Sequence, residues 1–369
     1  MSRAEPSRLN SRLRVIPRAL TGMIGARRPP GGSPQRILVA HHLLPGDVLM
    51  LTPLLAKLRA RYGDADIAMT VRRGMADLYG GKPYGTRALV YDPRDASTLD
   101  AIFAGGGYDL ACVPGDNRYS WLAAAAGARW TIAFDGDRPV WKSWPVDELR
   151  AFPEAPAAWG DMVAGLVDGP PPTPFRASDW PAPACRGFER PQGRYAVLHV
   201  EASTALKHWE DHKWMALAER LAARGVGVVW SAGPSGEACL RRIDAQGRFA
   251  ALGHKLDLAQ LWHLVKDAAL LVCPDTSVMH IGRLTGTPTV ALFGPSSASL
   301  FGPGEFLRDA PYRAVTIADF PCRDQRTLFK REIPWVRRCQ RSHAECASPR
   351  CMQAIDVELV SSAALALVR

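Results

Sequence analysis

Long apolar runs are missing from this sequence. No segment approaches the roughly 18 consecutive apolar residues that a membrane-spanning helix needs. The N-terminus also has no continuous apolar region of the kind that secretory signals contain. These two absences argue against an integral membrane protein and against a secreted one. We therefore expect a cytosolic protein.

Several familiar catalytic patterns are absent as well. The sequence has no Gly-x-x-x-x-Gly-Lys-Ser/Thr loop, no Gly-x-Ser-x-Gly elbow and no His-Glu-x-x-His helix, so none of these sites competes for the function. The glycine run Gly105-Gly106-Gly107 lacks the spacing of a dinucleotide-binding turn, and it precedes a predicted strand instead of opening a helix. Nicotinamide chemistry is therefore disfavoured.

What the sequence does contain is an ordinary globular composition with an uneven charge. The 369 residues are 47% hydrophobic, 22% charged and 8% aromatic, which is typical of a chain with two folded domains. The net charge is +10, but residues 1–36 contribute +7 and residues 322–351 contribute +5, whereas the long segment 37–321 carries −1. This distribution argues against a nucleic-acid-binding surface and indicates two local segments that attract anions.

We interpret residues 1–35 as a basic extension that is flexible or amphipathic. Apolar side chains recur there at helical spacing, with arginines between them: Leu9, Leu13, Ile16, Leu20 and Ile24. Pro17 would kink such a helix, and residues 29–34 have the composition of a linker. A basic amphipathic segment suits an anionic membrane surface. The alternative is a disordered tail whose periodicity is accidental.

Short apolar strands alternate with helical patterns along the rest of the chain. In the first half we expect a helix over 48–62, a second helix after residue 71, and strands at 37–40, 67–71, 88–91 and 109–113. In the second half we expect helices at 213–224, 258–265 and 278–285, and strands at 196–200, 226–231, 268–273 and 289–293. Such alternation predicts an α/β protein with parallel sheets covered by helices.

A Pro-rich stretch at 168–193 separates the two halves. It leaves little room for regular structure, because proline fixes φ and removes a backbone donor. We therefore predict a first domain over 36–178, a linker over 179–193 and a second domain over 194–369.

A polar turn follows one of the apolar strands of the second half. After the strand at 268–273, Asp275, Thr276 and Ser277 open a helix that carries His280. Free backbone N–H groups and the positive end of the helix dipole lie at such a turn, at the edge of a parallel sheet where phosphates bind. Either Asp275 or Thr276 is the candidate N-cap of that helix. The alternative to a binding role is that Asp275 only caps the helix and that His280 only packs.

Three further features follow strands. A Gly-Pro turn, Gly294–Ser297, comes after 289–293, and we expect it to line one crevice with the turn at Asp275. Lys207 lies just beyond the strand at 196–200, where a lysine suits a phosphate but is more commonly a solvated surface residue. Asp47 lies at a strand-to-helix turn, where it is either a general base or a helix cap.

Read in order, these pieces form a longer pattern: Gly46-Asp47-Val48-Leu49, Thr52-Pro53-Leu54-Leu55, Lys207-x-Trp209, Gly233-Pro234, Asp275-Thr276 with Met279-His280, and Gly286-Thr287-Pro288-Thr289-Val290-Ala291-Leu292-Phe293-Gly294-Pro295. The pattern resembles glycosyltransferase family 9, the ADP-heptose:lipopolysaccharide heptosyltransferases. The resemblance spans about residues 36–360 and therefore covers both predicted domains.

The resemblance implies a GT-B fold, in which two Rossmann-like domains face each other across a cleft and the last helix crosses back to the first domain. It implies inverting transfer of a heptose from ADP-heptose, a nucleotide-sugar donor, without a cofactor for catalysis. Asp47 matches the family's general base, and Lys207 matches the lysine that neutralises the donor phosphate. The remaining residues that would bind the donor are Ser203, Glu237, Asp275, Thr276, Ser277 and His280.

The acceptor implied by the resemblance is a lipopolysaccharide core or another surface glycan, on the inner face of the inner membrane. Leu43-Leu44-Pro45, Glu201 and Ser297-Ala298 depart from the usual family residues. The alternatives are a protein acceptor, a nucleotide-sugar epimerase of the same fold, and a degenerate sugar-nucleotide-binding protein without transferase activity.

Eight cysteines are present, and four of them cluster within residues 322–351: Cys322, Cys339, Cys346 and Cys351. Four thiolates can hold Zn or Fe tetrahedrally, which makes a structural metal one reading of the cluster. No Cys-x-x-Cys pair occurs, however, and a reduced cytosolic protein disfavours disulfides. The other reading is a set of ordinary thiols.

Overall fold

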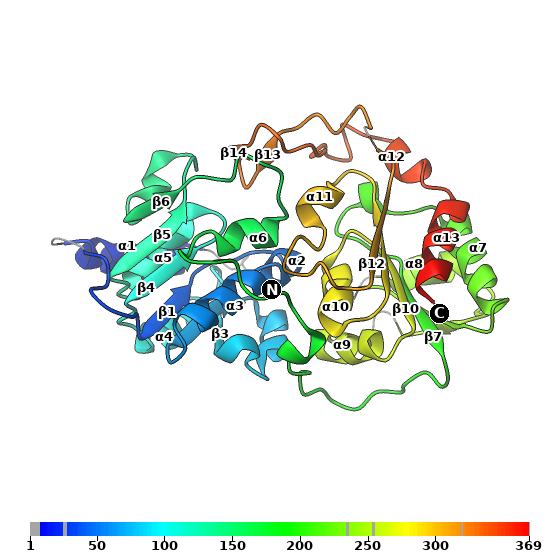
Figure 1. Cartoon of the computed structure of the whole chain (residues 1–369), viewed down its shortest axis with the longest axis horizontal. Helices are drawn as coiled ribbons and strands as arrows, with labels where there is room; N and C mark the ends of the chain where they lie inside the picture. The colour runs from blue at the N-terminus through cyan, green and yellow to red at the C-terminus, as the bar shows by residue number, and fades with distance from the viewer. Residues whose placement is uncertain (1–7, 25–27, 234–235, 253–254, 319, 369) are drawn as a thin grey trace, which may run out of the picture. The chain divides into compact units, whose positions relative to one another are not determined.

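The computed structural model of the chain describes residues 8–24, 28–233, 236–252, 255–318 and 320–368. The chain forms two compact units (Figure 1). The N-terminal unit consists of Met1–Glu154, Gly160–Thr173 and Thr327–Ile333, and the C-terminal unit of Ala155–Trp159, Pro174–Arg326 and Pro334–Arg369. Each unit holds one six-stranded sheet in which all neighbouring strands are parallel. The expected α/β class is therefore confirmed.

The sheet of the N-terminal unit has the strand order β3-β2-β1-β4-β5-β6. Its strands are β1 (Arg36–Val39), β2 (Asp66–Val71), β3 (Thr86–Val90), β4 (Leu110–Val113), β5 (Trp130–Phe134) and β6 (Glu148–Arg150). Its helices are α1 (Leu9–Gly22), α2 (Pro45–Leu49), α3 (Thr52–Arg61), η1 (Arg73–Tyr79), η2 (Pro83–Gly85), α4 (Thr98–Ala104), η3 (Asn117–Tyr119), α5 (Ser120–Ala125) and η4 (Val140–Ser143). The helix α6 (Trp159–Ala164) begins in one unit and ends in the other.

Two helix predictions for this unit were wrong in detail. The single helix expected over 48–62 is divided into α2 and α3, because Pro53 has no backbone N–H with which to continue α2. The hydroxyl of Thr52 donates to the carbonyl of Leu49 at 2.6 Å and stabilises the break. The second helix, expected after residue 71, is the 3₁₀ helix η1.

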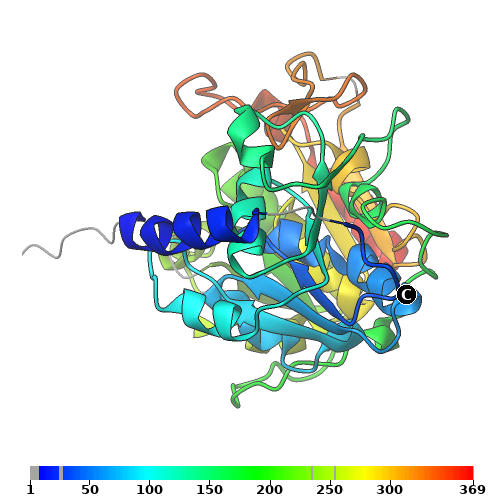
Figure 2. The ribbon, with the colours of Figure 1, turned by 90° about the vertical axis from the view of Figure 1, so that its left-hand side faces the viewer.

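The N-terminal helix α1 packs on the alanine-rich helix α5 (Figure 2, dark blue). Its buried side chains are small: Ser11, Val15 and Ala19. Between Arg8 and Ile24 the chain is thus ordered, so the reading of this stretch as a disordered tail is wrong. Pro17 lies inside the helix.

The sheet of the C-terminal unit has the order β12-β11-β10-β7-β8-β9. Its strands are β7 (Tyr195–His199), β8 (Gly227–Ser231), β9 (Ala250–Ala251), β10 (Leu270–Pro274), β11 (Thr289–Phe293) and β12 (Tyr312–Thr316). Its helices are η5 (Ala177–Asp179), η6 (Ala205–Lys207), α7 (Asp211–Ala222), α8 (Glu237–Ile243), α9 (Leu258–Lys266), α10 (Ser277–Thr285), α11 (Ala298–Phe301), α12 (Arg350–Gln353) and α13 (Val357–Leu367). β7, β10 and β11 are buried along their whole length, as strands covered on both faces must be.

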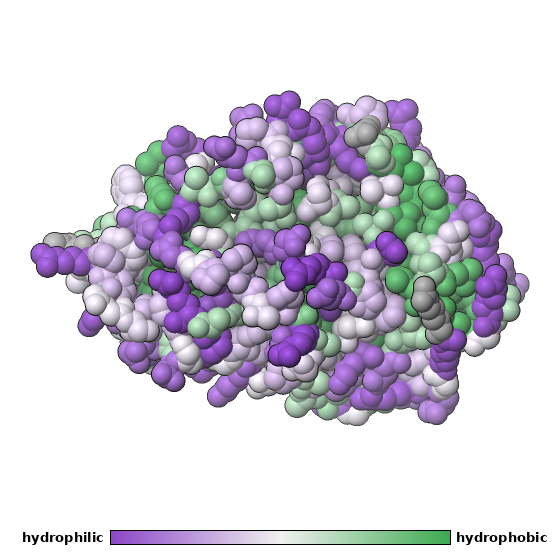
Figure 3. Space-filling model, viewed as in Figure 1, coloured by the Kyte–Doolittle hydropathy of each residue, from purple (hydrophilic) through white to green (hydrophobic). Residues whose placement is uncertain are grey.

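The last helix, α13, packs within the C-terminal unit against α7, β11 and β12. Val360 and Ala364 are buried in the hydrophobic core of that unit, and Arg220 of α7 pairs with Glu358 at 2.7 Å. The expectation that the last helix crosses back to the first domain was therefore wrong. On the face shown in Figure 3, hydrophobic residues gather over α13, where Leu359 is exposed.

A short hairpin belongs to the N-terminal unit although its sequence lies near the C-terminus. Its strands are β13 (Thr327–Leu328) and β14 (Arg331–Glu332). Among the helices in the described part of the chain, none combines the length and the apolar character that crossing a bilayer requires.

Candidate functional site

In each sheet the strand order reverses at one point, and ligands of open α/β sheets bind beyond the carboxyl ends of the strands at such a point. In the C-terminal unit the reversal lies between β7 and β10, which pair directly through Leu270 and Ala196. η6, with Lys207, follows β7, and Asp275 follows β10. Two of the predicted donor-binding residues therefore come from the two strands at the reversal.

Lys207 and Asp275 are in direct contact. The Lys207 ammonium donates to a carboxylate oxygen of Asp275 at 2.6 Å and to its backbone carbonyl at 3.0 Å. Ser296, from the Gly-Pro turn after β11, donates to the same carboxylate oxygen at 2.5 Å. The two turns thus meet, as expected. Asp275 is buried, whereas the side chain of Lys207 keeps 22% of its exposure and remains accessible to a ligand.

Thr276 is the N-cap of α10, and its hydroxyl accepts a hydrogen bond from the N–H of Val278 at 3.2 Å. Asp275 therefore does not cap the helix, and that alternative was wrong. Ser277, half-buried, is the first helical residue. The N-terminus of α10 lies directly after the Lys207–Asp275 pair, so backbone N–H groups and an ammonium group meet at one edge of the sheet, an arrangement suited to phosphate.

His280 is buried on α10 and accepts a hydrogen bond at Nδ1 from the guanidinium of Arg283. Because a guanidinium can only donate, the proton of the neutral His280 ring lies on Nε2. Burial first, and then the nearby charges of Arg283 and Lys207, hold the pKa of His280 well below its ordinary value. His280 is thus a neutral residue that presents one N–H.

Two other predicted residues are exposed. Ser203 is exposed in the loop between β7 and η6. Glu237 is exposed in the first turn of α8 and pairs with Arg241 at 2.6 Å. The residue that reaches the glycine turn before α8 is Glu201, whose carboxylate accepts the N–H of Gly233 at 2.7 Å.

In the N-terminal unit the strand order reverses between β1 and β4. Asp47 follows β1 and is the third residue of α2, whose N-cap is Leu44. Asp47 is therefore not the N-cap residue of α2, and that alternative was wrong. Its half-buried position in the first turn is compatible with the favourable end of a helix dipole.

Two histidines that sequence reasoning passed over precede Asp47. The N–H of His41 donates to the Thr70 hydroxyl at 2.8 Å, and Arg72 donates to the Leu43 carbonyl at 2.9 Å. Burial lowers the pKa of His41 to about 3, and burial with the charge of Arg72 lowers that of His42 to about 4. The signal was the His41-His42 pair directly after a buried strand, at the ligand-binding edge of the sheet.

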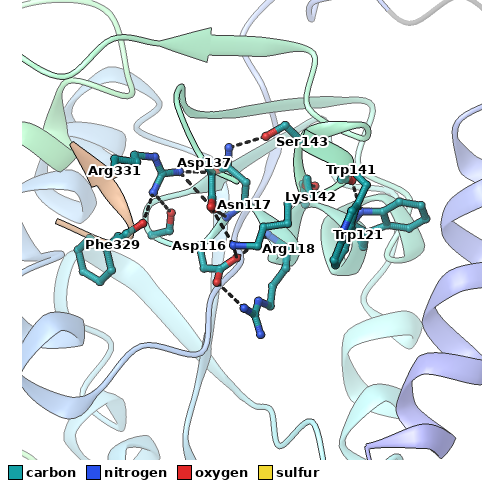
Figure 4. A network of polar contacts seen from close by, with 12 residues as sticks. Asp116, Asn117, Arg118, Trp121, Asp137, Trp141, Lys142, Ser143, Phe329 and Arg331 are labelled. Carbon is teal, nitrogen blue, oxygen red and sulfur yellow. Dashed lines mark hydrogen bonds and ion pairs between the residues drawn. The ribbon is translucent and has the colours of Figure 1, made fainter. Parts of the chain in front are cut away.

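The turn after β4 is held by the β13–β14 hairpin (Figure 4). The Arg331 guanidinium donates to Asn117 Oδ1 at 2.7 Å and to the carbonyls of Gly115 at 2.9 Å and Asp135 at 2.7 Å. Arg331 is buried and lies 3.6 Å from Asp137. This arginine belongs to the basic segment 322–351, so part of that segment's charge is used inside the protein and not for anions.

The same network contains one of the two Asp-x-Asp sequences in the chain, Asp135-Gly136-Asp137; the other is Asp64-Ala65-Asp66. Carboxylates at this spacing suit divalent cations. Asp137, however, is fully buried against the ammonium of Lys142 at 2.8 Å. With Arg331 nearby as well, the Asp137 carboxylate is neutralised by cationic side chains of the protein.

The structure does not support a metal at the four clustered cysteines. All eight cysteines are free thiols, and burial raises the pKa of Cys322 and Cys351 above that of a free thiol. Within the described residues, the structure gathers no group of three or more His, Cys, Asp or Glu side chains suited to a metal ion. The suggestion of Zn or Fe at Cys322, Cys339, Cys346 and Cys351 is unsupported.

Known proteins share both the sequence pattern and the fold. The profile of "Glycosyltransferase family 9 (heptosyltransferase)" matches residues 108–326. Lipopolysaccharide heptosyltransferase 1 of Pseudomonas aeruginosa is 30% identical over 250 residues, which are 62% of this chain and 68% of that protein.

Two solved structures of Escherichia coli share the fold. ADP-heptose lps heptosyltransferase II has a TM-score of 0.66 at 18% identity, covering 90% of this chain and 98% of that one. Heptosyltransferase WaaC with ADP has a TM-score of 0.62 at 17% identity, covering 76% and 92%. The expected GT-B class, with two parallel α/β domains, is confirmed. The chain belongs to glycosyltransferase family 9, the heptosyltransferase family, and is a glycosyltransferase.

Proposed function

We propose that this enzyme transfers a heptose from ADP-heptose to a lipopolysaccharide core or a related surface glycan, with inversion at the anomeric carbon and without a metal ion. The observation that carries the proposal is the Lys207–Asp275 pair beside the N-terminus of α10. This arrangement supports a leaving diphosphate, because an ammonium group and free N–H groups stabilise the charge that develops on it.

Asp47 is the proposed general base. Its carboxylate takes the proton of an acceptor hydroxyl while that oxygen attacks the anomeric carbon of the heptose. The bond from that carbon to the phosphate oxygen breaks, and ADP leaves with the electron pair. The step requires the Asp47 turn and the Lys207–Asp275 pair to come together around the two substrates.

The donor assignment draws on two kinds of support. The P. aeruginosa relative is a lipopolysaccharide heptosyltransferase, and one of the solved structures contains ADP. Thr276, Ser277 and the Nε2–H of His280 supply donors for the phosphates. We keep Ser203 and Glu237 as candidates for the nucleoside side of the donor.

We also propose that the enzyme works as a peripheral protein at the cytoplasmic face of the inner membrane. A lipopolysaccharide-type acceptor is a glycolipid, so the sugar that accepts the heptose is held at a membrane surface. We further propose that the acceptor binds the N-terminal unit and the donor the C-terminal unit, the units that correspond to the predicted domains 36–178 and 194–369.

The test is a donor screen followed by a transfer assay. ADP and ADP-heptose should raise the melting temperature of the protein more than GDP- or UDP-sugars do, because a ligand that binds only the folded state stabilises it. Labelled heptose should then appear on heptose-free lipopolysaccharide core, with an anomeric configuration opposite to that of the donor. Transfer to a protein only would identify a different acceptor, and binding without any transfer would identify a degenerate enzyme; either result contradicts the proposal.

A further inference from the structure

A hollow of about 900 Å³ lies beside α1 in the N-terminal unit. One part of its lining is aromatic, from Trp121, Trp141 and Trp144, and another is aliphatic, from Val15 and Ile16 of α1. The indole N–H of Trp121 donates to the Trp141 carbonyl at 3.0 Å, and the two rings lie 6.4 Å apart (Figure 4). The hollow is therefore mainly apolar and has ordered walls.

The apolar stripe of α1 faces away from the protein. The helix buries its small residues against α5, as described above, and this leaves the large apolar residues exposed: Leu9, Leu13, Ile16 and Leu20. Leu13 keeps 63% of its exposure, and Trp144, beside the hollow, also keeps 63%. Four large apolar side chains exposed at helical spacing on one face of α1 are typical of a surface that contacts something other than water.

The three arginines of α1 and its N-cap, Arg8, divide into two pairs with different surroundings. Arg14 pairs with Asp100 at 2.5 Å, and Arg18 lies 4.3 Å over the ring of Phe103, so both hold the helix on its own unit. Arg8 and Arg12 instead are exposed and line the hollow. Their charge is therefore available at the mouth of an apolar site.

Ser11 adds a polar group to the apolar wall. Its side chain is buried and lines the hollow. Among the described residues, its hydroxyl has no hydrogen-bond partner. A buried polar group without a partner costs free energy, and an ester or phosphate oxygen of a ligand in the hollow would satisfy it.

We propose that this face, formed by α1 and η4, docks on an anionic lipid bilayer, and that the hollow takes one acyl chain of a phosphate-bearing lipid. Leu9, Leu13 and Leu20 enter the boundary of the acyl region, as the apolar face of an interfacial helix does. Trp141 and Trp144 provide rings of the kind that concentrate at membrane–water interfaces.

Charge distinguishes this occupant from a second copy of the chain. Arg8 and Arg12 are complementary to lipid phosphate. A symmetric contact between two copies of this face would bring the same arginines of both copies together, and like charges across an interface are unfavourable. The bilayer is therefore the occupant that the charges favour.

The docking face adjoins the candidate acceptor site. The ring of His42, which lies in the loop before Asp47, contacts the rings of Tyr91 at 5.8 Å and Tyr119 at 6.4 Å. Both tyrosines line the hollow. If the acceptor is a glycolipid, in which respect the inference rests on the proposed function, its head group would meet the protein next to the proposed base.

The test uses the full-length protein and synthetic vesicles. Wild type should float with vesicles of phosphatidylglycerol and phosphatidylcholine and bind pure phosphatidylcholine at least tenfold more weakly. Arg12→Glu and Leu13→Ser should each weaken binding to the anionic vesicles at least tenfold. Arg224→Glu, the same charge change at an exposed arginine of the C-terminal unit, should bind like wild type. Circular dichroism checks that each variant is folded.

A second measurement reports on the hollow itself. Lipids brominated along their acyl chains should quench tryptophan fluorescence, and Trp121→Phe, Trp141→Phe and Trp144→Phe together should remove most of that quenching. Equal vesicle binding by Arg12→Glu and Arg224→Glu, or binding without quenching, would overturn the proposal, as would self-association through this face that abolishes vesicle binding. Transfer by wild type to a lipid-free core sugar is measured separately, so failure of the docking face and failure of the proposed reaction are distinguishable.

Discussion

The ammonium of Lys207 lies 2.6 Å from a carboxylate oxygen of Asp275, although the two residues are 68 positions apart in the chain. The contact joins the segments after β7 and β10 at the point where the strand order of the C-terminal sheet reverses. Asp275 thus holds the lysine in position beside the N-terminus of α10. An anion that binds there meets a cation whose location is already fixed.

The first prediction concerns Lys207→Ala. The change removes the ammonium and leaves a buried carboxylate facing the donor phosphates. Because a hydrogen bond to a charged group contributes about 1.5–3 kcal/mol, ADP should bind roughly 10–100-fold more weakly. Titration calorimetry with ADP measures this. Lys266→Ala, at an exposed lysine of α9, is the matched control, and an unchanged ADP affinity of Lys207→Ala would rule out the phosphate role.

The sequence predicted the members of this site more readily than their contacts. Asp275 and Thr276 stood out because they follow a buried apolar run, and such a pattern can be read from residues that are neighbours in the sequence. The neighbouring residues alone did not show that Thr276 caps the helix while Asp275 pairs with Lys207. They also did not show Ser296 as a partner of Asp275, because the order and register of the strands bring these turns together, and neither can be read from the sequence.

The second prediction concerns Asp47→Asn. Asparagine can no longer accept the proton, and general base catalysis contributes about 10²–10⁴-fold, so the transfer rate should fall within that range. The fold should persist, because the N-cap of α2 is Leu44 and not Asp47. A transferase assay with saturating donor, with ADP binding as a check on the donor site, measures the loss. Asp64→Asn, at an exposed aspartate of the same unit, should retain full activity; comparable rates for the two variants would exclude Asp47 as the base.

The fold could be predicted where neighbouring residues determine the secondary structure, but not where residues distant in the sequence determine how an element packs. The strand at 289–293 was predicted with the observed bounds, Thr289–Phe293. The large apolar residues of α1 were read correctly as a helical stripe, but the side of the helix that packs could not be read. Small residues such as Ala19 bury well only because α5, about a hundred residues later, is also lined with alanine, and this is information that neither segment contains alone.

The third prediction concerns Arg331→Met. The buried guanidinium satisfies Asn117 and several carbonyls and lies beside Asp137. Removing one partner of a buried ion pair costs about 3–5 kcal/mol, so the free energy of unfolding should fall by about that amount. Urea denaturation measures it. Arg326→Met, at an exposed arginine just before the hairpin, should change the midpoint little, and equal midpoints for the two variants would show that the network adds no stability.

The last prediction concerns pH. His199 is buried, with its Nδ1 3.1 Å from the Ser231 hydroxyl, and burial lowers its pKa to about 4 from the ordinary value of 6.5. Between these two values the unfolded chain binds a proton that the folded chain excludes, so stability falls as the pH drops from about 6.5 to about 4 and does not depend on this group above 6.5.

The shift corresponds to at most about 3 kcal/mol. His199→Asn, which keeps a polar atom near the Nδ1 position, should flatten the decline of the urea midpoint between pH 6.5 and 4. His212→Asn, at an exposed histidine of α7, should leave the decline as in wild type. Because His41, His42 and His280 also have lowered pKa values, part of the decline should persist in His199→Asn. An identical slope in that variant and in wild type would mean that His199 already takes up its proton in the folded protein.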